Sequence, residues 1–293
     1  MVRCAFIILT YKTYLRTETL VDELLSDFPE HDKIIVVDNA SPNDAFGYLS
    51  ARYSNCKQVD VIQSPENGGY AAGNNVGLRY AKKYSPEYVC IINNDIRFNI
   101  NVIDKLIKRF LAIDDIGFIA PRQVDTNGND TIFQTLKVPD FAYDIRSYCF
   151  LLQNKKHKYE ENCGIESTQR VGIIPGAFLF TDYKLFESIG FFDEITFLYC
   201  EERFLGQKIM DFDKHCYIAF DLSYIHDHGL TISKLYDSSS QSEMILNARK
   251  KYIKAYRRLP AIQNAILTCF YHYHAMVSKI INHLKSIRQV NNS

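Results

Sequence analysis

Short apolar segments alternate with segments of helical periodicity over the first 120 residues. Five segments are apolar and rich in β-branched residues, as strands buried on both faces are: 4–9, 33–37, 59–63, 88–92 and 117–120. Between them, apolar residues recur at helical spacing over 17–28, 44–53, 71–84 and 102–113. This alternation predicts βαβ units and therefore an α/β fold with a mainly parallel central sheet.

The alternation weakens after Pro121. A turn-forming cluster, DTNGND at 125–130, precedes a candidate strand over 131–138, and residues 140–168 show no clear period. We interpret 140–168 as an irregular insertion. Regular elements are expected again as strands at 170–174 and 177–181, helices at 183–188 and from Glu201 onward, and strands at 216–220 and 223–226.

Charge is distributed unevenly along the chain. The 293 residues include 34 basic and 34 acidic side chains, and the hydrophobic content of 47% and charged content of 23% are ordinary for a globular protein. Residues 244–293, however, contain no Asp or Glu but nine Lys or Arg residues. We therefore predict a domain over 1–236 and a basic helical C-terminal extension over 237–293.

Cysteine usage and the N-terminal sequence indicate the compartment. Eight cysteines are scattered without a C-x-x-C pair, which is typical of a reducing environment rather than of a disulfide framework. The apolar run after Arg3 is only AFIIL and is followed at once by polar residues, so no secretory signal is expected. We expect a cytoplasmic location.

Polar residues end the first two predicted strands. Asp38 ends IIVVD, where its carboxylate is placed to accept hydrogen bonds from a uracil or thymine imide, or from a ribose. Thr10 and Tyr11, at the end of the first strand, are placed to line the same pocket. The alternative role of Asp38 is that of a turn or helix cap.

A segment rich in glycine and asparagine, ENGGYAAGNN, covers 66–75. Glycines at a helix start let backbone N–H groups approach an anion, and the helix N-terminus favours negative charge. The asparagine amides add groups that hold sugar or ribose hydroxyls, although glycine pairs are also common in ordinary turns. The donor-binding candidates in this segment are Asn67, Gly69 and Asn74.

Two candidate metal ligands lie far apart in the sequence. Asp95 ends IINND directly after a predicted strand, and one carboxylate at the edge of a parallel sheet is a usual way to hold Mn²⁺ or Mg²⁺ against substrate phosphates. His226 and His228 follow the last predicted strand, and a neutral His226 ring would complete that site. The alternative roles are a turn cap for Asp95 and structural roles for the histidines. Asn94 is a further donor-binding candidate.

Two adjacent carboxylates are candidates for a catalytic base. Glu201 and Glu202 follow the aromatic run TFLYC and begin a predicted helix. A carboxylate in a partly apolar pocket is a suitable general base for a hydroxyl group, whereas acids at a helix start are also common for electrostatic reasons alone. Neighbouring side chains on a helix point in different directions, and the sequence does not decide which of the two is the base.

In order and spacing, these segments resemble the family 2 glycosyltransferases, and within them the bacterial rhamnosyltransferase-like group. The matching motifs are TYK at 10–12, VVDNAS at 36–41, NGGYAAGNN at 67–75, NND at 93–95, LYCEE at 198–202 and YIH at 224–226. The resemblance covers roughly residues 4–232. Lys12 replaces the asparagine that usually follows T-Y, and Glu202 replaces the usual aspartate. The first departure concerns the floor of the pocket, and the second concerns which residue is the base.

The resemblance implies a GT-A type nucleotide-sugar-binding fold, a divalent metal, and inversion at the anomeric carbon by single displacement. It implies that Asp38 contacts the donor base, that Asp95 and His226 hold Mn²⁺ or Mg²⁺, and that Glu202 is the base, a role that Glu201 takes over if the longer side chain shifts the acceptor. The implied function is transfer of a sugar from a dTDP- or UDP-sugar to a glycan acceptor in bacterial surface polysaccharide synthesis. Rhamnose is suggested only by the subgroup.

The basic extension has two interpretations. Residues 244–288 mix Lys and Arg with Ile, Leu, Tyr and Phe, which is typical of an amphipathic helix on an anionic membrane surface. Such peripheral contact suits an acceptor linked to a polyprenyl lipid, and the run at 265–281 is too short and too polar to span a bilayer. The alternative is an extension that packs on the catalytic domain or on a second subunit of a homo-oligomer. No nucleic-acid partner is expected.

Two rival functions remain open at this stage. A nucleotidyltransferase shares the α/β sheet and the metal–phosphate chemistry, but it would be expected to carry a Gly-rich loop with Arg and Lys after the first strand, and ILTYKTYLRT has no glycine. A nucleotide-sugar- or carbohydrate-binding protein without transferase activity would use the same acids structurally. In either transferase interpretation, acceptor selection is expected to involve 140–168.

Overall fold

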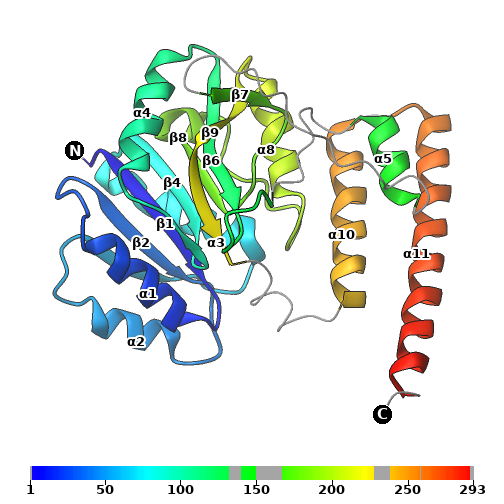
Figure 1. The fold of residues 1–293 in the computed structure, drawn as a ribbon, viewed down its shortest axis with the longest axis horizontal. Coiled ribbons are helices and arrows are strands. Elements are labelled where there is room, and N and C mark those ends of the chain that lie inside the picture. The colour runs from blue at the N-terminus through cyan, green and yellow to red at the C-terminus, as the bar shows by residue number, and fades with distance from the viewer. Residues whose placement is uncertain (1, 132–139, 150–166, 228–237, 258, 291–293) are drawn as a thin grey trace.

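An α/β body and a separate layer of helices lie side by side in the computed structural model (Figure 1). The structure describes residues 2–131, 140–149, 167–227, 238–257 and 259–290. The body begins with β1 (Cys4–Thr10), α1 (Tyr14–Leu25), β2 (Lys33–Asp38), α2 (Ala45–Arg52), β3 (Val59–Gln63), α3 (Gly69–Ala81) and β4 (Tyr88–Asn93). These positions confirm the strand–helix alternation that the hydrophobic pattern predicts.

The strands form one sheet that is mainly parallel. The first four pair in parallel in the order β3-β2-β1-β4. β8 (Phe178–Asp182) is antiparallel to β4, and beyond it β6 (Ile116–Val124) and β9 (His215–His226) run parallel to each other. Two short strands, β5 (Ile96–Arg97) and β7 (Thr168–Val171), pair antiparallel with β9. The described residues thus give a nine-stranded sheet with the predicted parallel character.

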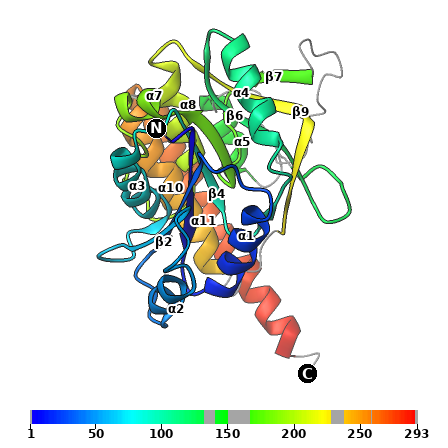
Figure 2. The ribbon, with the colours of Figure 1, turned by 90° about the vertical axis from the view of Figure 1, so that its left-hand side faces the viewer.

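Helices cover both faces of the sheet, which is why its central strands are apolar throughout. Successive residues of β1 alternate between two cores. Phe6 and Ile8 pack with α1, α2 and α4 (Val102–Ala112), whereas Ala5 and Ile7 pack with α3, α7 (Tyr183–Ser188) and α8 (Glu201–Met210). Figure 2 shows α1 on one side of the sheet and α3 and α7 on the other. Burial on both faces fixes the carboxyl ends of β1, β2 and β4 at one edge of the sheet.

The two strands expected at 216–220 and 223–226 are one continuous strand, β9. Its pairing register with β6 shifts between the pairs Pro121–Ala219 and Arg122–Ser223, so residues 220–222 form a bulge. Asp221 lies in this bulge and forms an ion pair with the buried Arg109 of α4. The polar interruption in the sequence therefore marks a bulge rather than a strand end. The strand expected at 170–174 is β7, which begins two residues earlier.

Helix α5 (Phe141–Tyr148) corrects the interpretation of 140–168 as irregular. The Asp140 side chain caps it by accepting a hydrogen bond from the Tyr143 N–H at 2.7 Å. Tyr148 is buried in a cluster with side chains of α10 (Ser238–Tyr252) and α11 (Ala261–Val290). A helix of this length depends on such tertiary packing and leaves a weak periodic signal. The candidate strand at 131–138 and the remainder of the insertion, 150–166, lie outside the described residues.

The C-terminal extension packs on the body. A π-helical turn, Ile253–Arg257, follows α10 and precedes α11. One apolar cluster joins both helices to α5 and to the start of α8: Tyr148, Cys200, Phe204, Leu246, Ala248, Tyr252, Ile253 and Leu267. The Lys251 ammonium also donates to the Ile195 carbonyl at 2.9 Å. Packing of the extension on the α/β body is thus the interpretation that the described residues support, while the boundary at 236–237 stays a prediction.

No helix in the described part of the chain has the length and apolar character needed to cross a bilayer.

Candidate active site

The Asp38 carboxylate lies at the end of β2, completely buried beside Thr10 of β1. Its Oδ2 accepts hydrogen bonds from the Ser41 N–H at 3.2 Å and from the Gln63 side-chain amide at 3.1 Å. Oδ1 is also buried and has no hydrogen-bond partner among the described residues. Asp38 therefore stabilises its own turn, as the alternative interpretation expected, and still presents one acceptor oxygen. A buried acceptor without a partner is costly, so a ligand donor is favoured at this position.

The end of β1 continues into a turn in which Lys12 has a left-handed backbone, with a φ of 63°. Its N–H donates to Ser41 Oγ at 2.9 Å, which ties the turns after β1 and β2 together. The Lys12 ammonium lies 5.0 Å from the centroid of the Tyr11 ring, a cation–π contact. Tyr11 is partly exposed, whereas Thr10 is buried. The lysine that departs from the family pattern thus lies against Tyr11, a predicted donor-binding residue.

The 66–75 segment is held against the chain that precedes the two glutamates. Gly69 has a φ of +85°, and a Cβ atom there would lie 1.8 Å from the Phe197 carbonyl oxygen. The next N–H, of Tyr70, donates to that same carbonyl at 3.0 Å. Only glycine meets both requirements at position 69. Asn67 Oδ1 accepts hydrogen bonds from the Gly69 N–H and from the Asn39 side chain. The turn is therefore held by a bond within itself and by a bond from the residue that follows β2.

Asn39 is a site residue that the sequence analysis did not single out. Its amide nitrogen donates to Asn67 Oδ1 at 2.9 Å and to the Gly69 carbonyl at 3.1 Å. Its own Oδ1 is buried and has no partner among the described residues. Because Asn39 follows Asp38 directly, its place in the VVDNAS motif is the signal that points to it. It connects the end of β2 to the glycine turn.

The remaining asparagines make contacts within the protein. Asn74 donates to the Tyr70 carbonyl at 2.9 Å, and its buried Oδ1 has no partner in the described part of the chain. Asn75 bonds both the N–H and the carbonyl of Phe192. Asn94 donates from its side chain to three hydroxyl oxygens at 2.8–3.4 Å, those of Thr10, Thr13 and Thr17. Asn94 thereby ties the start of α1 to the end of β4.

Asp95 and His226 meet across the β5–β9 pairing. The Asp95 Oδ1 atom and the His226 Nε2 atom are 3.1 Å apart, and each side chain is 11% exposed. The register pairs Ile96 with His226, and the Asp227 N–H donates to the Asp95 carbonyl, which fixes the backbone on both sides. Residues 131 positions apart in the chain are therefore brought together as the sequence analysis expected. His228 lies outside the described residues.

This pair fits two positions of a divalent ion. Two ligands at right angles, each about 2.1 Å from an octahedral ion, lie about 3 Å apart. The separation of 3.1 Å between Asp95 Oδ1 and His226 Nε2 matches that spacing. Within the described ranges, no group of three or more His, Cys, Asp or Glu side chains is arranged to hold a metal. An ion held here by two protein ligands leaves the other positions for substrate oxygens and water.

The Gly176 peptide connects the three parts of the site, and the sequence analysis missed it. Its carbonyl accepts a hydrogen bond from the Tyr70 hydroxyl at 2.5 Å, and its N–H is a hydrogen-bond donor to the Glu202 carboxylate. The next carbonyl, of Ala177, accepts from the Asn93 N–H at the end of β4. A Cβ atom at 176 would lie 3.0 Å from Glu202 Oε1. Glycine therefore allows the backbone to lie directly against the carboxylate.

Helix α8 begins with the two glutamates after an unusual turn. Tyr199 and Cys200 both have left-handed backbones, with φ angles of 74° and 71°. Successive non-glycine residues in this region cost on the order of 1–3 kcal/mol each and are typical of functional sites. Glu201 is 6% exposed, and its Oε1 has no hydrogen-bond partner among the described residues. Glu202 is less buried than Glu201 as a whole residue, and its carboxylate lies against the Gly176 backbone.

The two glutamates differ in the order in which they lose their protons. Burial, with a further contribution from the charge of Glu202, raises the pKa of Glu201 to about 8, although the N–H groups of Glu201 and Tyr199 oppose that shift. Burial also raises the pKa of Glu202, but the N–H groups of Glu202 and Gly176 and the charge of Arg203 oppose that shift. In a coupled pair the better-stabilised carboxylate ionises first. Glu202 is therefore the carboxylate, and Glu201 the neutral acid, between the two ionisations.

Tyr224 of β9 is within electrostatic range of both Asp95 and Glu202. It is completely buried, and its hydroxyl donates to Gln123 Oε1 at 2.7 Å. Burial raises the pKa of Tyr224, and the nearby charges of Glu202 and Asp95 raise it further. Both carboxylates are thus close enough to act on one buried ring. The sequence offers no signal for this role, because an aromatic residue in a strand is usually part of the core.

Comparison with known proteins decides the family. The family model described as glycosyl transferase family 2 matches residues 5–186, which is more than half of the chain. The chain belongs to glycosyltransferase family 2. The family 2 chain is 26% identical to the low-salt glycan biosynthesis hexosyltransferase Agl10 of Haloferax volcanii over an alignment of 201 residues. This alignment covers 68% of the chain and 58% of that relative. The chain therefore spans a little over half the length of this relative.

Solved structures of glycosyltransferases share the fold of this family 2 chain. GalNAc-T7 with UDP, GalNAc and Mn²⁺ superposes with a TM-score of 0.66 at 12% identity, over 94% of this chain and 54% of that one. The mannosyltransferase PcManGT from Pyrobaculum calidifontis, in complex with GDP-Man and Mn²⁺, gives 0.60 at 16%, over 95% and 73%. S. aureus TarS residues 1–349 with UDP-GlcNAc give 0.53 at 17%, over 92% and 72%. The predicted GT-A fold is confirmed.

Proposed function

We propose that the chain is an inverting, metal-dependent glycosyltransferase that moves one sugar from a nucleoside-diphosphate donor to a glycan acceptor. One observation carries the proposal: Asp38, the Asp95–His226 pair and Glu202 gather at the carboxyl ends of β1, β2 and β4. Thr10 and Asp38 are opposite each other in the β1–β2 pairing, and the Asn94 side chain donates a hydrogen bond to Thr10. The Asn93 N–H donates to the Ala177 carbonyl, next to the Gly176 N–H that donates to Glu202. The edge of an open α/β sheet is where such folds bind nucleotides.

Asp38 is the proposed contact for the donor base. Its buried Oδ1 has no partner among the described residues, and a uracil or thymine imide presents one N–H donor to match it. We therefore favour a UDP- or dTDP-sugar as the donor. Support for nucleotide-sugar binding also comes from the related folds, whose structures contain UDP, UDP-GlcNAc or GDP-Man.

Asp95 and His226 would hold Mn²⁺ or Mg²⁺. When bound, the ion offsets the negative charge that develops on the departing nucleoside diphosphate. The two side chains would both contribute to holding the ion, because the turn that precedes β5 lies beside the end of β9. GalNAc-T7 and PcManGT were both solved with Mn²⁺, which supports Mn²⁺ as the first ion to test.

Glu202 is the proposed general base. Its carboxylate takes the proton from the acceptor hydroxyl while that oxygen forms a bond to the anomeric carbon of the donor. The bond from this carbon to the diphosphate oxygen breaks, and the nucleoside diphosphate leaves with the bonding electrons. Attack opposite to the leaving group inverts the configuration. Glu201, the neutral neighbour with its pKa near 8, keeps a second negative charge away from the base near neutral pH.

Donor binding tests the nucleotide site. We expect UDP or dTDP, or one of their sugars, dTDP-rhamnose among them, to raise the melting temperature of the full chain with Mn²⁺ and not with EDTA, since binding to the native state stabilises it. Thermal unfolding is measured over a panel that also includes GDP-mannose. A shift without subsequent turnover of the donor would favour the rival interpretation, a nucleotide-sugar-binding protein. No shift with any nucleotide would contradict the proposal.

We also propose that α11 lies on an anionic membrane surface, where a polyprenyl-linked acceptor would be presented. Its exposed apolar residues are three, four or seven positions apart, which are helical spacings, and so share one face: Ile262, Ile266, Tyr273, Met276 and Ile280. Leu267 and Tyr271 belong to the cluster on the opposite, packed side. The excess of positive charge over 244–293 complements anionic lipids, whereas a second copy of the same helix would bring like charges together.

Vesicle pelleting tests this surface. The full chain is expected to pellet with phosphatidylglycerol vesicles and not with phosphatidylcholine vesicles. The double substitution Ile266→Ser and Ile280→Ser should lower the partition coefficient at least about tenfold, because two buried isoleucines contribute several kcal/mol. Asn264→Ser with Thr268→Ser, both exposed on the same helix, is the matched control. Equal pelleting of all three proteins would rule out the α11 surface.

A further inference from the structure

Arginine side chains from α8, from α10 and from the π-helical turn that follows α10 gather near one carboxylate of α5. Arg203 Nη1 lies 3.3 Å from Asp144 Oδ1, with side-chain exposures of 8% and 1%. Arg249 and Arg257 are also close enough to lower the pKa of Asp144, although burial raises it on balance. In the part of the chain that the structure describes, three guanidinium groups thus surround this carboxylate, and the charge is unbalanced.

Arg249 is the clearest sign of that imbalance. It makes no hydrogen bond or ion pair in the described part of the chain. Burial lowers its pKa, and the like charge of Arg203 lowers it further. A guanidinium stays protonated even so, and it carries five N–H donors. Leaving a charge enclosed without a partner is costly. The structure therefore contains a cation whose natural partner is an anion from outside the chain.

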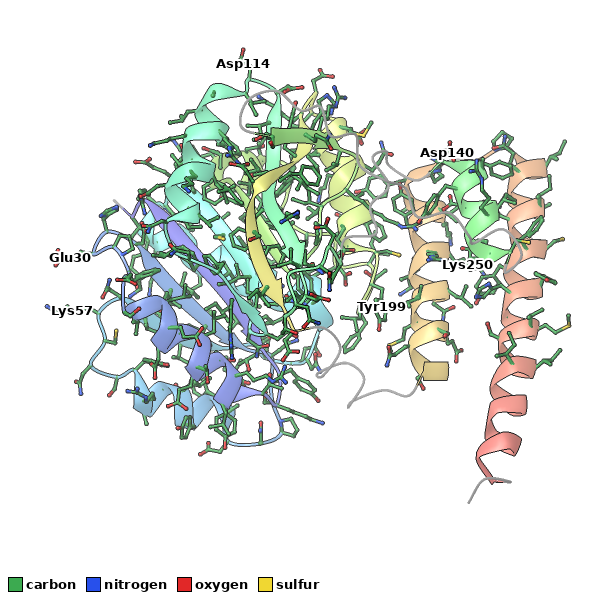
Figure 3. All side chains as sticks on the ribbon, in the orientation of Figure 1. Glu30, Lys57, Asp114, Asp140, Tyr199 and Lys250 are labelled. Atoms are coloured by element: carbon green, nitrogen blue, oxygen red, sulfur yellow. The ribbon has the colours of Figure 1, made fainter. Side chains whose placement is uncertain are left out.

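Arg257 adds to the same cluster. Its Nε atom is buried and has no hydrogen-bond partner in the described ranges. Arg249 and Arg257 nevertheless keep partly exposed surfaces, so an anion can approach them. In Figure 3, Asp140 at the start of α5 and Lys250 of α10 mark the helices that flank the cluster, and Tyr199 lies on the side of the body that faces α10. The cluster lies between the body and the helical layer.

The cluster is next to the proposed base. Arg203 follows Glu202 directly on α8, about 100° further round the helix. Cys200 is within electrostatic range of both the arginines and the glutamates. Burial has the largest effect and raises the pKa of Cys200; Glu202 and Glu201 raise it further, whereas Arg203 and Arg249 lower it. An anion on the arginines would therefore lie close to the Glu202 carboxylate, on which the charge of Arg203 acts.

We propose that Arg203, Arg249 and Arg257 form an anion site that binds the phosphate or diphosphate group of the acceptor. The inference rests on the proposed function, because an acceptor sugar linked through a diphosphate would bring this group beside the base. Planar guanidinium groups match phosphate oxygens in pairs. Three guanidinium groups against the carboxylates of Asp144 and Glu202 leave a net positive charge, which suits a further anion such as a phosphate group. The apolar residues of the neighbouring cluster, such as Phe204 and Tyr252, are placed beside the anion.

Inorganic pyrophosphate in EDTA is the first probe, because chelation removes any metal contribution at Asp95. At a hundredfold excess over its Kd it should raise the melting temperature of the full chain by about 5 °C. Arg249→Gln should weaken pyrophosphate binding at least about tenfold. Lys254→Gln, an exposed cation on the turn that follows α10, and Asp95→Asn should both bind pyrophosphate as the wild type does. Asp95→Asn thereby separates this site from the donor site.

The melting temperature without anion separates binding from a structural role. Arg249→Gln removes a like-charge repulsion with Arg203, so in anion-free buffer we expect an unchanged or higher melting temperature than in the wild type. Loss of stability in that buffer, with the pyrophosphate shift retained, would overturn the proposal and assign the arginine to packing. Absence of any pyrophosphate shift in the wild type would also overturn it, whether or not donor nucleotides bind with Mn²⁺.

The source of the phosphate is distinguished by a second probe. Geranyl diphosphate carries the same head group on an apolar chain. For a lipid-linked acceptor, we expect geranyl diphosphate to bind more tightly than pyrophosphate. Arg249→Gln should weaken the binding of both compounds. Equal affinities would assign the site to free phosphate compounds instead, and would overturn the assignment to the acceptor while leaving donor binding at Asp38 unaffected.

Discussion

Replacement of Glu202 by Gln is expected to lower kcat by about 10²–10⁴-fold, the usual contribution of a general base. Gln keeps the size of the side chain but cannot take the proton from the acceptor hydroxyl. Donor affinity should change little, because the donor-base contact at Asp38 lies at the end of β2, whereas Glu202 lies on α8. Initial rates of nucleoside diphosphate release with acceptor present, together with donor binding, check both expectations.

Glu201→Gln is the matched control for this prediction. Below pH 8 Glu201 is the neutral acid of the pair, and the amide of Gln resembles a protonated carboxyl group. We expect this variant to retain activity within about tenfold of the wild type. Above pH 8 the wild type gains a second adjacent charge and Glu201→Gln does not, so their pH–rate profiles should diverge there. Full activity in Glu202→Gln, or the larger loss in Glu201→Gln, would transfer the role to Glu201.

Asp95→Asn is expected to abolish most metal-dependent turnover, by about 10³-fold, since a metal at a departing diphosphate contributes several kcal/mol. The amide retains the shape of the side chain but loses the charge that attracts the ion. Mn²⁺ titrations of the rate, and of nucleotide binding, give the measurement. The protein should remain folded, because the Asp95 carbonyl, which accepts from the Asp227 N–H, is unaltered.

Asp227→Asn supplies a control one residue beyond the His226 ligand. Its side chain is exposed, so the loss of its charge should leave the Mn²⁺ dependence within about twofold of the wild type. His226→Gln should raise the Mn²⁺ concentration needed for half-maximal rate, as one ligand of two is weakened. Equal losses in Asp95→Asn and Asp227→Asn would indicate a general electrostatic effect and would contradict a metal site at Asp95.

The sheet and its carboxyl-end residues could be predicted from the sequence because their signals are local. Strands buried on both faces are continuously apolar, and each one ends where a polar residue such as Asp38 or Asp95 begins the loop. Parallel pairing then brings those ends to one edge. The family motifs added His226, which lies 131 positions from Asp95 and has no local signal for that partnership.

Other parts of the site depend on contacts that a sequence pattern does not encode. Gly176 contacts Glu202 and Tyr70 only once three distant segments are packed. The raised pKa of Glu201 is a consequence of burial by that packing, so the order of ionisation could not be assigned in advance. Helix α5 is likewise stabilised by α10 and α11 rather than by its own periodicity.

The most direct test of the central claim is release of nucleoside diphosphate from a panel of UDP-, dTDP- and GDP-sugars by the full chain, with and without Mn²⁺. The account predicts that one UDP- or dTDP-sugar is turned over, that Mn²⁺ is required, and that Glu202→Gln abolishes the release. If no donor were turned over while nucleotides still bound, the chain would be a binding protein. Turnover that is unchanged in Glu202→Gln or independent of metal would contradict the proposed mechanism.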